Sequence, residues 1–190
     1  IEGTNFTGSL LIGHSTTGTL SSAEQNTGVG IGALDALTSG DHNTAVGRGA
    51  GGAIAGGQSN TIVGAIAGAA LTSGSDNVVI GRHALRTEDG HGRNVAIGRS
   101  ALETLNAGAD AYNTAVGYNA GAAVTTGTKN SIVGGLAGDA VTTGSNNIII
   151  GYEAAASAVD VSNEVTIGNS SVANVRIPAD STLKIGASGD

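Results

Sequence analysis

The chain has 190 residues, a formal net charge of −7, 33 glycines and 39% hydrophobic residues, and it has no cysteine, methionine or tryptophan. Without cysteine it has no disulfides or thiolate metal sites, and its eight dispersed Lys and Arg residues argue against nucleic-acid binding. No run of about 18 apolar residues occurs, so no membrane insertion is predicted. A core of small aliphatic side chains favours stacked thin layers, an oligomer, or both.

A five-residue motif recurs about every 17 residues, and residues 113–117 are a representative copy. Copies begin at Asn26, Asn43, Asn60, Asn77, Asn94, Asn113, Asn130, Asn147 and Asn163, with a longer step of 19 after Asn94 and a step of 16 before Asn163. Ser9 lies one further step upstream, and the first motif residue is called position 1 here. A fixed period predicts an all-β repeat protein, a β-solenoid or β-roll. We divide it into a lead-in (1–8), nine solenoid units (9–162) and an irregular C-terminal β segment (163–190).

The first half of each unit has the pattern of a short strand. Position 4 is always Val or Ile from Ile12 to Ile150, and position 2 lies on the same face by the two-residue period of a strand. We therefore predict that this face is the inner one, so that Val116→Asp is costly. Position 3 is also often apolar, which predicts a second covering layer such as a neighbouring chain.

Two positions of the motif predict specific backbone features. Position 5 is Gly from Gly13 to Gly151, which predicts a turn or a close approach at the end of every strand. Stacked layers would superpose the position 1 amides into a structural ladder. The predicted ladder residues are Asn43, Asn60, Asn77, Asn94, Asn113, Asn130 and Asn147.

The second half of each unit combines Ala at position 8, an aliphatic residue at position 12 and Gly at position 15. This spacing is compatible with one helical turn capped by the glycine. Strands stack about 4.8 Å apart, however, whereas packed helices need about 8–10 Å. We therefore expect short extended or single-turn segments in place of true helices.

These repeats resemble the Gly- and Asn-rich repeats of bacteriophage tail fibres, and 94–98 is similar to the head repeats of trimeric autotransporter adhesins (YadA-like). The resemblance implies an extracellular, homotrimeric fibre segment that displays or forms a surface for attachment to a host-cell glycan or protein. The alternating residues 163–186 look like the part of tail fibres that precedes a self-cleaved chaperone. A bacterial surface adhesin head is the alternative, and the units here are longer than adhesin-head units.

No catalytic or cofactor pattern accompanies the repeat. The glycine runs 28–33 and 47–52 are in register with it and lack the context of a dinucleotide loop. No catalytic residues, cofactor or metal are therefore predicted. An ice-binding β-solenoid is a further alternative, because Thr27, Thr44 and Thr61 align, although Val78 and Val95 interrupt the row.

Two consecutive units depart from the repeat, and we predict the receptor-binding site there. The turn 87–93 is polar in place of apolar, which predicts a solvated loop that could hold a cation, and the next unit is longer by two residues around 110–112. Stacking should bring both irregularities to one side, where solenoids often bind. The candidate contacts are Tyr112, Asp110, Glu88, Asp89, His91 and Arg93.

Overall fold

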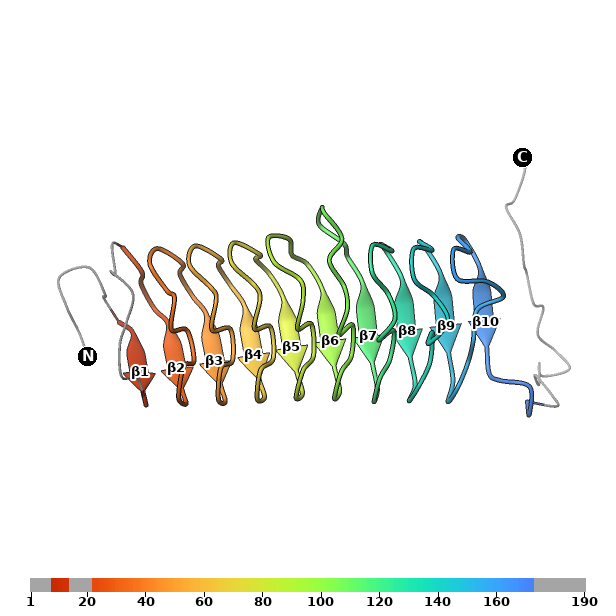
Figure 1. Cartoon of the computed structure of the whole chain (residues 1–190), viewed down its shortest axis with the longest axis horizontal. Helices are drawn as coiled ribbons and strands as arrows, with labels where there is room; N and C mark the ends of the chain where they lie inside the picture. The colour runs from red at the N-terminus through yellow and green to blue at the C-terminus, as the bar shows by residue number, and fades with distance from the viewer. Residues whose placement is uncertain (1–7, 14–21, 173–190) are drawn as a thin grey trace, which may run out of the picture.

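The protein is a parallel β-solenoid built from ten three-residue strands, as the computed structural model shows for residues 8–13 and 22–172 (Figure 1). The strands pair in chain order and in parallel, so each coil of the chain adds one strand to a single sheet. No helix occurs among the described residues, and the predicted all-β repeat fold is confirmed. The strands are β1 (Leu10–Ile12), β2 (Thr27–Val29), β3 (Thr44–Val46), β4 (Thr61–Val63), β5 (Val78–Ile80), β6 (Val95–Ile97), β7 (Thr114–Val116), β8 (Ser131–Val133), β9 (Ile148–Ile150) and β10 (Val165–Ile167).

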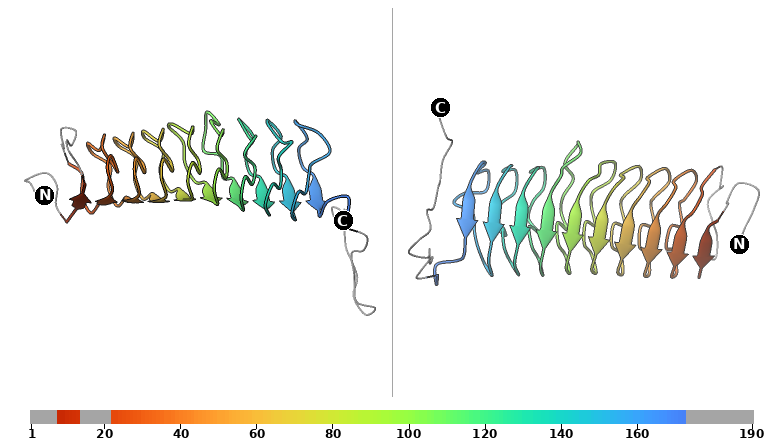
Figure 2. Two further views of the ribbon diagram at one scale, coloured as in Figure 1. Left: turned by 60° about the horizontal axis from the view of Figure 1, so that its bottom comes forward. Right: turned by 180° about the vertical axis from the view of Figure 1, so that it is seen from behind.

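The sheet forms one wall of the rod and the turns form the other (Figure 2). Backbone hydrogen bonds join successive layers all around the coil: Thr44 donates to the carbonyl of Asn60 at 2.8 Å, and Gly51, in the turn, donates to that of Ala67 at 2.9 Å. Every layer thus satisfies the polar backbone of its neighbours, and this pairing accounts for a regular 17-residue step.

The buried side of each strand is position 3, which corrects the predicted inner face. Ala45, Ile62 and Ala115 are fully buried, whereas Val46 and Val63 at position 4 are each 38% exposed. A two-residue period separates the faces of a strand but does not identify the inner one when both faces carry apolar residues. Position 3 also includes small residues because the space around it is already filled: a Cβ atom on Gly28 would lie 2.5 Å from a side-chain carbon of Leu11, its partner in β1, and 3.3 Å from the carbonyl oxygen of Ala33 in the turn.

The opposite wall of the core comes from the turns. Ala50 and Ala67 at position 8, and Ile54 and Leu71 at position 12, are fully buried against the sheet. These turns are not helical. Positive φ angles flank the buried alanine of position 8, for example 57° at Ser100 and 50° at Leu102 on either side of Ala101. The chain therefore reverses direction within a few residues, and the turn is no thicker along the rod than the strand of the same layer.

Glycine recurs at positions 5 and 15 of the repeat because successive layers approach each other closely there. At position 5, Gly117 has a φ of 143°, and a Cβ atom there would lie 2.4 Å from the carbonyl oxygen of Gly134. At position 15, a Cβ atom on Gly57 would lie 2.4 Å from the carbonyl oxygen of Gly74, and its φ is not positive. The position 15 glycine therefore makes room for the next layer and caps no helical turn, in agreement with the expectation of short non-helical segments.

The period continues through the tenth strand, which the sequence analysis assigned to the irregular segment. Val165 pairs with Ile148, so Glu164, and not Asn163, occupies position 1 and the step is 17 residues. The Glu164 amide donates to Asn147 Oδ1 at 2.9 Å. Hydrogen bonds from the hydroxyl groups of Ser157 and Thr166 lower the pKa of Glu164 below its ordinary value. The rest of the alternating segment, from 173 onward, lies outside the described residues.

Candidate functional site

The position 1 side chains form a continuous buried ladder along the rod. In each step, the backbone N–H of one asparagine donates to the Oδ1 of the preceding one, as from Asn60 to Asn43 at 3.1 Å. The Nδ2 group of Asn60 also donates to the carbonyl of Gly74 at 2.9 Å, which closes the same coil at its turn. All seven predicted ladder residues take part, and Asn26, Ser9 and Glu164 extend the ladder at its two ends. These amides are buried and hydrogen-bonded within the stack, so their role is structural.

The outward side of the sheet carries a row of aliphatic side chains, called the aliphatic face here. It consists of positions 2 and 4 of the ten strands. Position 4 is aliphatic in every strand, and Ile80 and Ile150 are 38% and 41% exposed. Position 2 is an aliphatic residue such as Ile148 in half of the strands and a hydroxyl residue such as Thr61 in the other half. The sequence analysis found these rows but assigned them to the interior.

Three of the predicted contact residues form one exposed cluster at the beginning of β7. Arg93 Nη1 donates to Asp110 Oδ2 and, at 2.9 Å, to the hydroxyl oxygen of Tyr112. Its guanidinium carbon also lies 5.5 Å from the centroid of the Tyr112 ring. Asp110, followed by Tyr112, raises the pKa of Arg93, so its charge is permanent. The tyrosine ring is 51% exposed and held in place by the arginine.

A second arginine–tyrosine pair, missed by the sequence analysis, lies at the other end of β7. Arg99 Nη1 donates to the Tyr118 hydroxyl at 3.0 Å, and its guanidinium carbon lies 5.5 Å from the ring centroid. Both residues occupy position 6 of consecutive units. That shared position is the signal by which the pair could have been found. Tyr112 and Tyr118 therefore border the aliphatic face at the two ends of one strand.

The other three predicted contacts surround a buried carboxylate. Glu88 is fully buried, which contradicts the predicted solvated loop. Its Oε1 accepts hydrogen bonds at 3.3 Å from the backbone N–H and the Nδ1 of His91, and its Oε2 accepts one at 3.2 Å from the N–H of Ala107. Asp89 is exposed beside them, with Oδ1 bound to the N–H of Gly90. The turn folds inward because Glu88 replaces the buried aliphatic residue of position 12.

The two irregular units lie in adjacent layers, and backbone hydrogen bonds join them. Asp110 Oδ1 accepts from the Gly92 N–H at 3.1 Å, and Ala107 is bound to Glu88 as described. The insertion is at 107–110, whereas the sequence analysis placed it around 110–112. Ala111 holds an ordinary layer position, since its carbonyl accepts from the Lys129 N–H at 2.7 Å. The longer turn projects above its neighbours between β6 and β7 (Figure 1).

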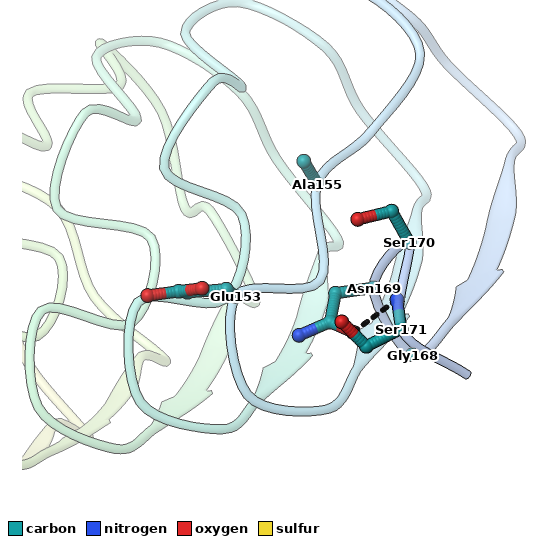
Figure 3. Close-up of a pocket in the computed structure, with 6 residues that line it drawn as sticks. All are labelled: Glu153, Ala155, Gly168, Asn169, Ser170 and Ser171. Atoms are coloured by element: carbon teal, nitrogen blue, oxygen red, sulfur yellow. Dashed lines mark hydrogen bonds between the residues drawn. The ribbon is translucent and has the colours of Figure 1, made fainter.

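A shallow pocket lies at the end of the described stack, lined by Glu153, Ala155, Gly168, Asn169, Ser170 and Ser171 (Figure 3). The side chain of Asn169 is held by two hydrogen bonds: Oδ1 accepts from the Ser171 N–H at 2.9 Å, and Nδ2 donates to the Tyr152 carbonyl at 3.0 Å. One carboxylate and two hydroxyl groups line the pocket, and its lining residues include no histidine or lysine. This set does not assemble an activated nucleophile.

The fold and these surfaces define a single-sheet parallel β-solenoid with one exposed aliphatic face. Comparisons with known protein families, curated proteins and solved structures give no match to this chain. Within the residues that the structure describes, no helix is long and apolar enough to cross a membrane.

Proposed function

We propose that this chain is a structural segment of a trimeric extracellular fibre, of the kind found in bacteriophage tails, and that copies associate through the aliphatic face. The observation that carries the proposal is the exposure of position 4 in strand after strand, from Val46 through Val63 and Ile80 to Val133 and Ile150. Parallel sheets are normally covered on both sides. A regular aliphatic row that faces water therefore favours a protein partner.

The size of the aliphatic face suits an interface between identical chains. Three residues per strand and ten strands give a projected area of about 500 Å², from rises of about 3.3 Å and strand spacings of about 4.8 Å. Counting one bordering residue at each end of every strand raises the projected area to about 800 Å², which is the area that each partner of a standard interface buries. The border at the C-terminal end of the strands contains Arg99 and Tyr118, and polar rims with arginine and tyrosine are typical of interfaces.

A second copy of the chain is the occupant that best fits this surface. The face repeats along the rod with the same 17-residue step as the chain, so an identical partner in the same register offers a matching row at every layer. Parallel association of identical rods gives cyclic symmetry and a fibre. The number three and the extracellular location come from the resemblance to tail-fibre and adhesin repeats.

The native mass tests the interface directly. We expect light scattering to give three times the 18.2 kDa chain mass. Val63→Lys should reduce this mass because it places a charge in the face, and Ser73→Lys, in a turn of the same layer, should not. A folded wild-type monomer would exclude self-association as the role of this face.

A bacterial adhesin head remains the alternative for the same architecture, and an ice-binding face is a third candidate. The observation that favours ice binding is the consecutive pairing of Thr27, Thr44 and Thr61 on the outward side of adjacent strands. A monomer that shows thermal hysteresis, lost in Thr44→Lys, would support that candidate over the fibre.

Host attachment is proposed at the cluster of Arg93, Asp110 and Tyr112. A half-exposed tyrosine held by an arginine gives contact area at low entropic cost to a cell-surface glycan or protein. Deletion of 108–109 should restore the 17-residue step while keeping Tyr112 in its layer position. If binding of labelled protein to bacterial cells survives both this deletion and Tyr112→Ala, attachment does not use this cluster.

A further inference from the structure

The turn that follows β5 contains an ionisable side chain where the fold elsewhere uses an aliphatic one. Leu71 precedes Glu88 in the stack of position 12 residues and Leu105 follows it, and all three are fully buried. Burial of a carboxylate is costly unless a cation or several strong donors compensate it. Among the described residues, no arginine or lysine pairs with Glu88, and its only ion-pair partner is His91.

The hydrogen bonds to Glu88 are long for a charged acceptor. The three N···O distances are 3.2–3.3 Å, whereas hydrogen bonds to a carboxylate from charged donors are typically about 2.7–2.9 Å. Two of the three donors are neutral backbone amides. The buried charge is therefore under-compensated by the protein alone, and this indicates that a cation belongs at the carboxylate.

The neighbouring side chains offer the remaining ligands. Glu88, Asp89 and His91 each present one ligand atom within 4.8 Å of the others, and no other such group of three occurs in the part of the chain that the structure describes. His91 Nδ1 lies 3.3 Å from Glu88 Oε1. Two ligands about 2.1 Å from a tetrahedral metal are separated by roughly 3.4 Å, so this pair already has the spacing of one edge of such a site.

We propose that Glu88, Asp89 and His91 bind a divalent transition-metal ion of the zinc class, with water at the remaining position. One imidazole nitrogen and two carboxylate oxygens suit zinc, whereas calcium and magnesium prefer oxygen ligands alone. The His91 side chain is 32% exposed and Asp89 lies at the surface, so an ion can enter from solvent.

The bound ion would fasten the irregular part of the solenoid. Glu88 Oε2 accepts from the backbone of Ala107, at the start of the insertion 107–110. A metal on the other oxygen orders the turn after β5, and this hydrogen bond extends the effect to the longer turn after β6. The site is independent of the proposed fibre function, since it lies within one chain.

The full chain, stripped of metal with EDTA, is the material for the test. We expect titration calorimetry with Zn²⁺ to show one site per chain, and Co²⁺ to give the visible absorption bands of a tetrahedral site. His91→Gln and Asp89→Asn should each weaken Zn²⁺ binding by at least about 100-fold, because each loses a direct ligand.

Two further variants separate a metal site from a simple ion pair. His83 Nδ1 lies 3.7 Å from Glu103, which also pairs with Arg86, so His83→Gln removes a comparable His–Glu contact and should leave Zn²⁺ affinity unchanged. Glu88→Leu restores the usual position 12 residue and should fold without binding the ion. The proposal is overturned if the wild type shows no site tighter than about 100 µM, if His83→Gln weakens binding as much as His91→Gln, or if Ca²⁺ binds more tightly than Zn²⁺.

Discussion

Replacement of a central ladder residue, Asn60→Ala, should destabilise the solenoid strongly. The side chain accepts from the backbone N–H and Nδ2 of Asn77 at 3.1 and 3.0 Å, and it donates to the Gly74 carbonyl and Asn43 Oδ1, both at 2.9 Å. Truncation leaves at least two buried backbone groups and one amide without these partners. At about 1–3 kcal/mol for each of these three groups, we expect a loss of about 3–9 kcal/mol, a large fraction of the about 5–15 kcal/mol that stabilises a typical domain.

Urea unfolding followed by circular dichroism measures this loss, with two comparison variants. Gln58→Ala, at an exposed residue two positions before Asn60, should change the unfolding free energy by less than about 0.5 kcal/mol. Asn60→Ser should cost about half as much as Asn60→Ala, because Ser9 shows that a hydroxyl at position 1 can accept the next backbone N–H, at 2.8 Å from Asn26. A cost below about 1 kcal/mol for Asn60→Ala would refute the ladder as a main stabilising element.

Three further substitutions or conditions test other parts of the structure. Gly117→Ala should cost about 2–4 kcal/mol of unfolding free energy in thermal or urea unfolding, because Gly117 has a positive φ and lies against the carbonyl group of the next layer. Gly135→Ala should cost less than about 1 kcal/mol, because the nearest neighbour of an added Cβ atom is a side-chain atom 3.5 Å away. Equal costs for the two variants would contradict the close-approach argument. Ala115→Asp should prevent folding, as judged by circular dichroism, while Val116→Asp should preserve the fold and reduce the native mass; loss of the fold in both would contradict the outward assignment of position 4. Because the pKa of Glu164 is lowered in the folded state, the contribution of Glu164 to folding stability is present above its ordinary pKa of about 4.5 and is lost as the pH falls through the lower folded value. Amide exchange in β10 should therefore accelerate in acid relative to amide exchange in β5. An unchanged ratio of the two exchange rates would contradict this.

The period of the sequence predicts the solenoid, the strand positions, the glycine turns and the asparagine ladder, because each depends on identical residues that superpose in every layer. Asn60 and Gly117 are examples, since each touches its own equivalent in the next layer or the backbone beside it. Because equivalent residues superpose, contacts of this kind can be predicted once one unit and the period of the repeat are known.

The direction of the strand faces could not be predicted in the same way. Val63 and Ile62 are both aliphatic, and only the closeness of the opposite wall decides that Ile62 is buried. Small residues such as Ala45 and Gly28 at position 3 look like poor core formers in the sequence. In the structure they are small because the alanines and leucines of the turns already occupy the thin core.

The irregular units show where a repeat pattern is insufficient. Glu88 has a charged type of side chain, for which exposure to solvent is expected. It occupies position 12, however, where the units on both sides fix the backbone, and this backbone directs the side chain into the core. A repeat fold thereby imposes burial on a residue that would avoid it in a free loop. Such a residue must be compensated by donors or by an ion, and the proximity of His91 and Asp89 to this carboxylate is therefore more informative about function than the same residues in a solvated turn would be.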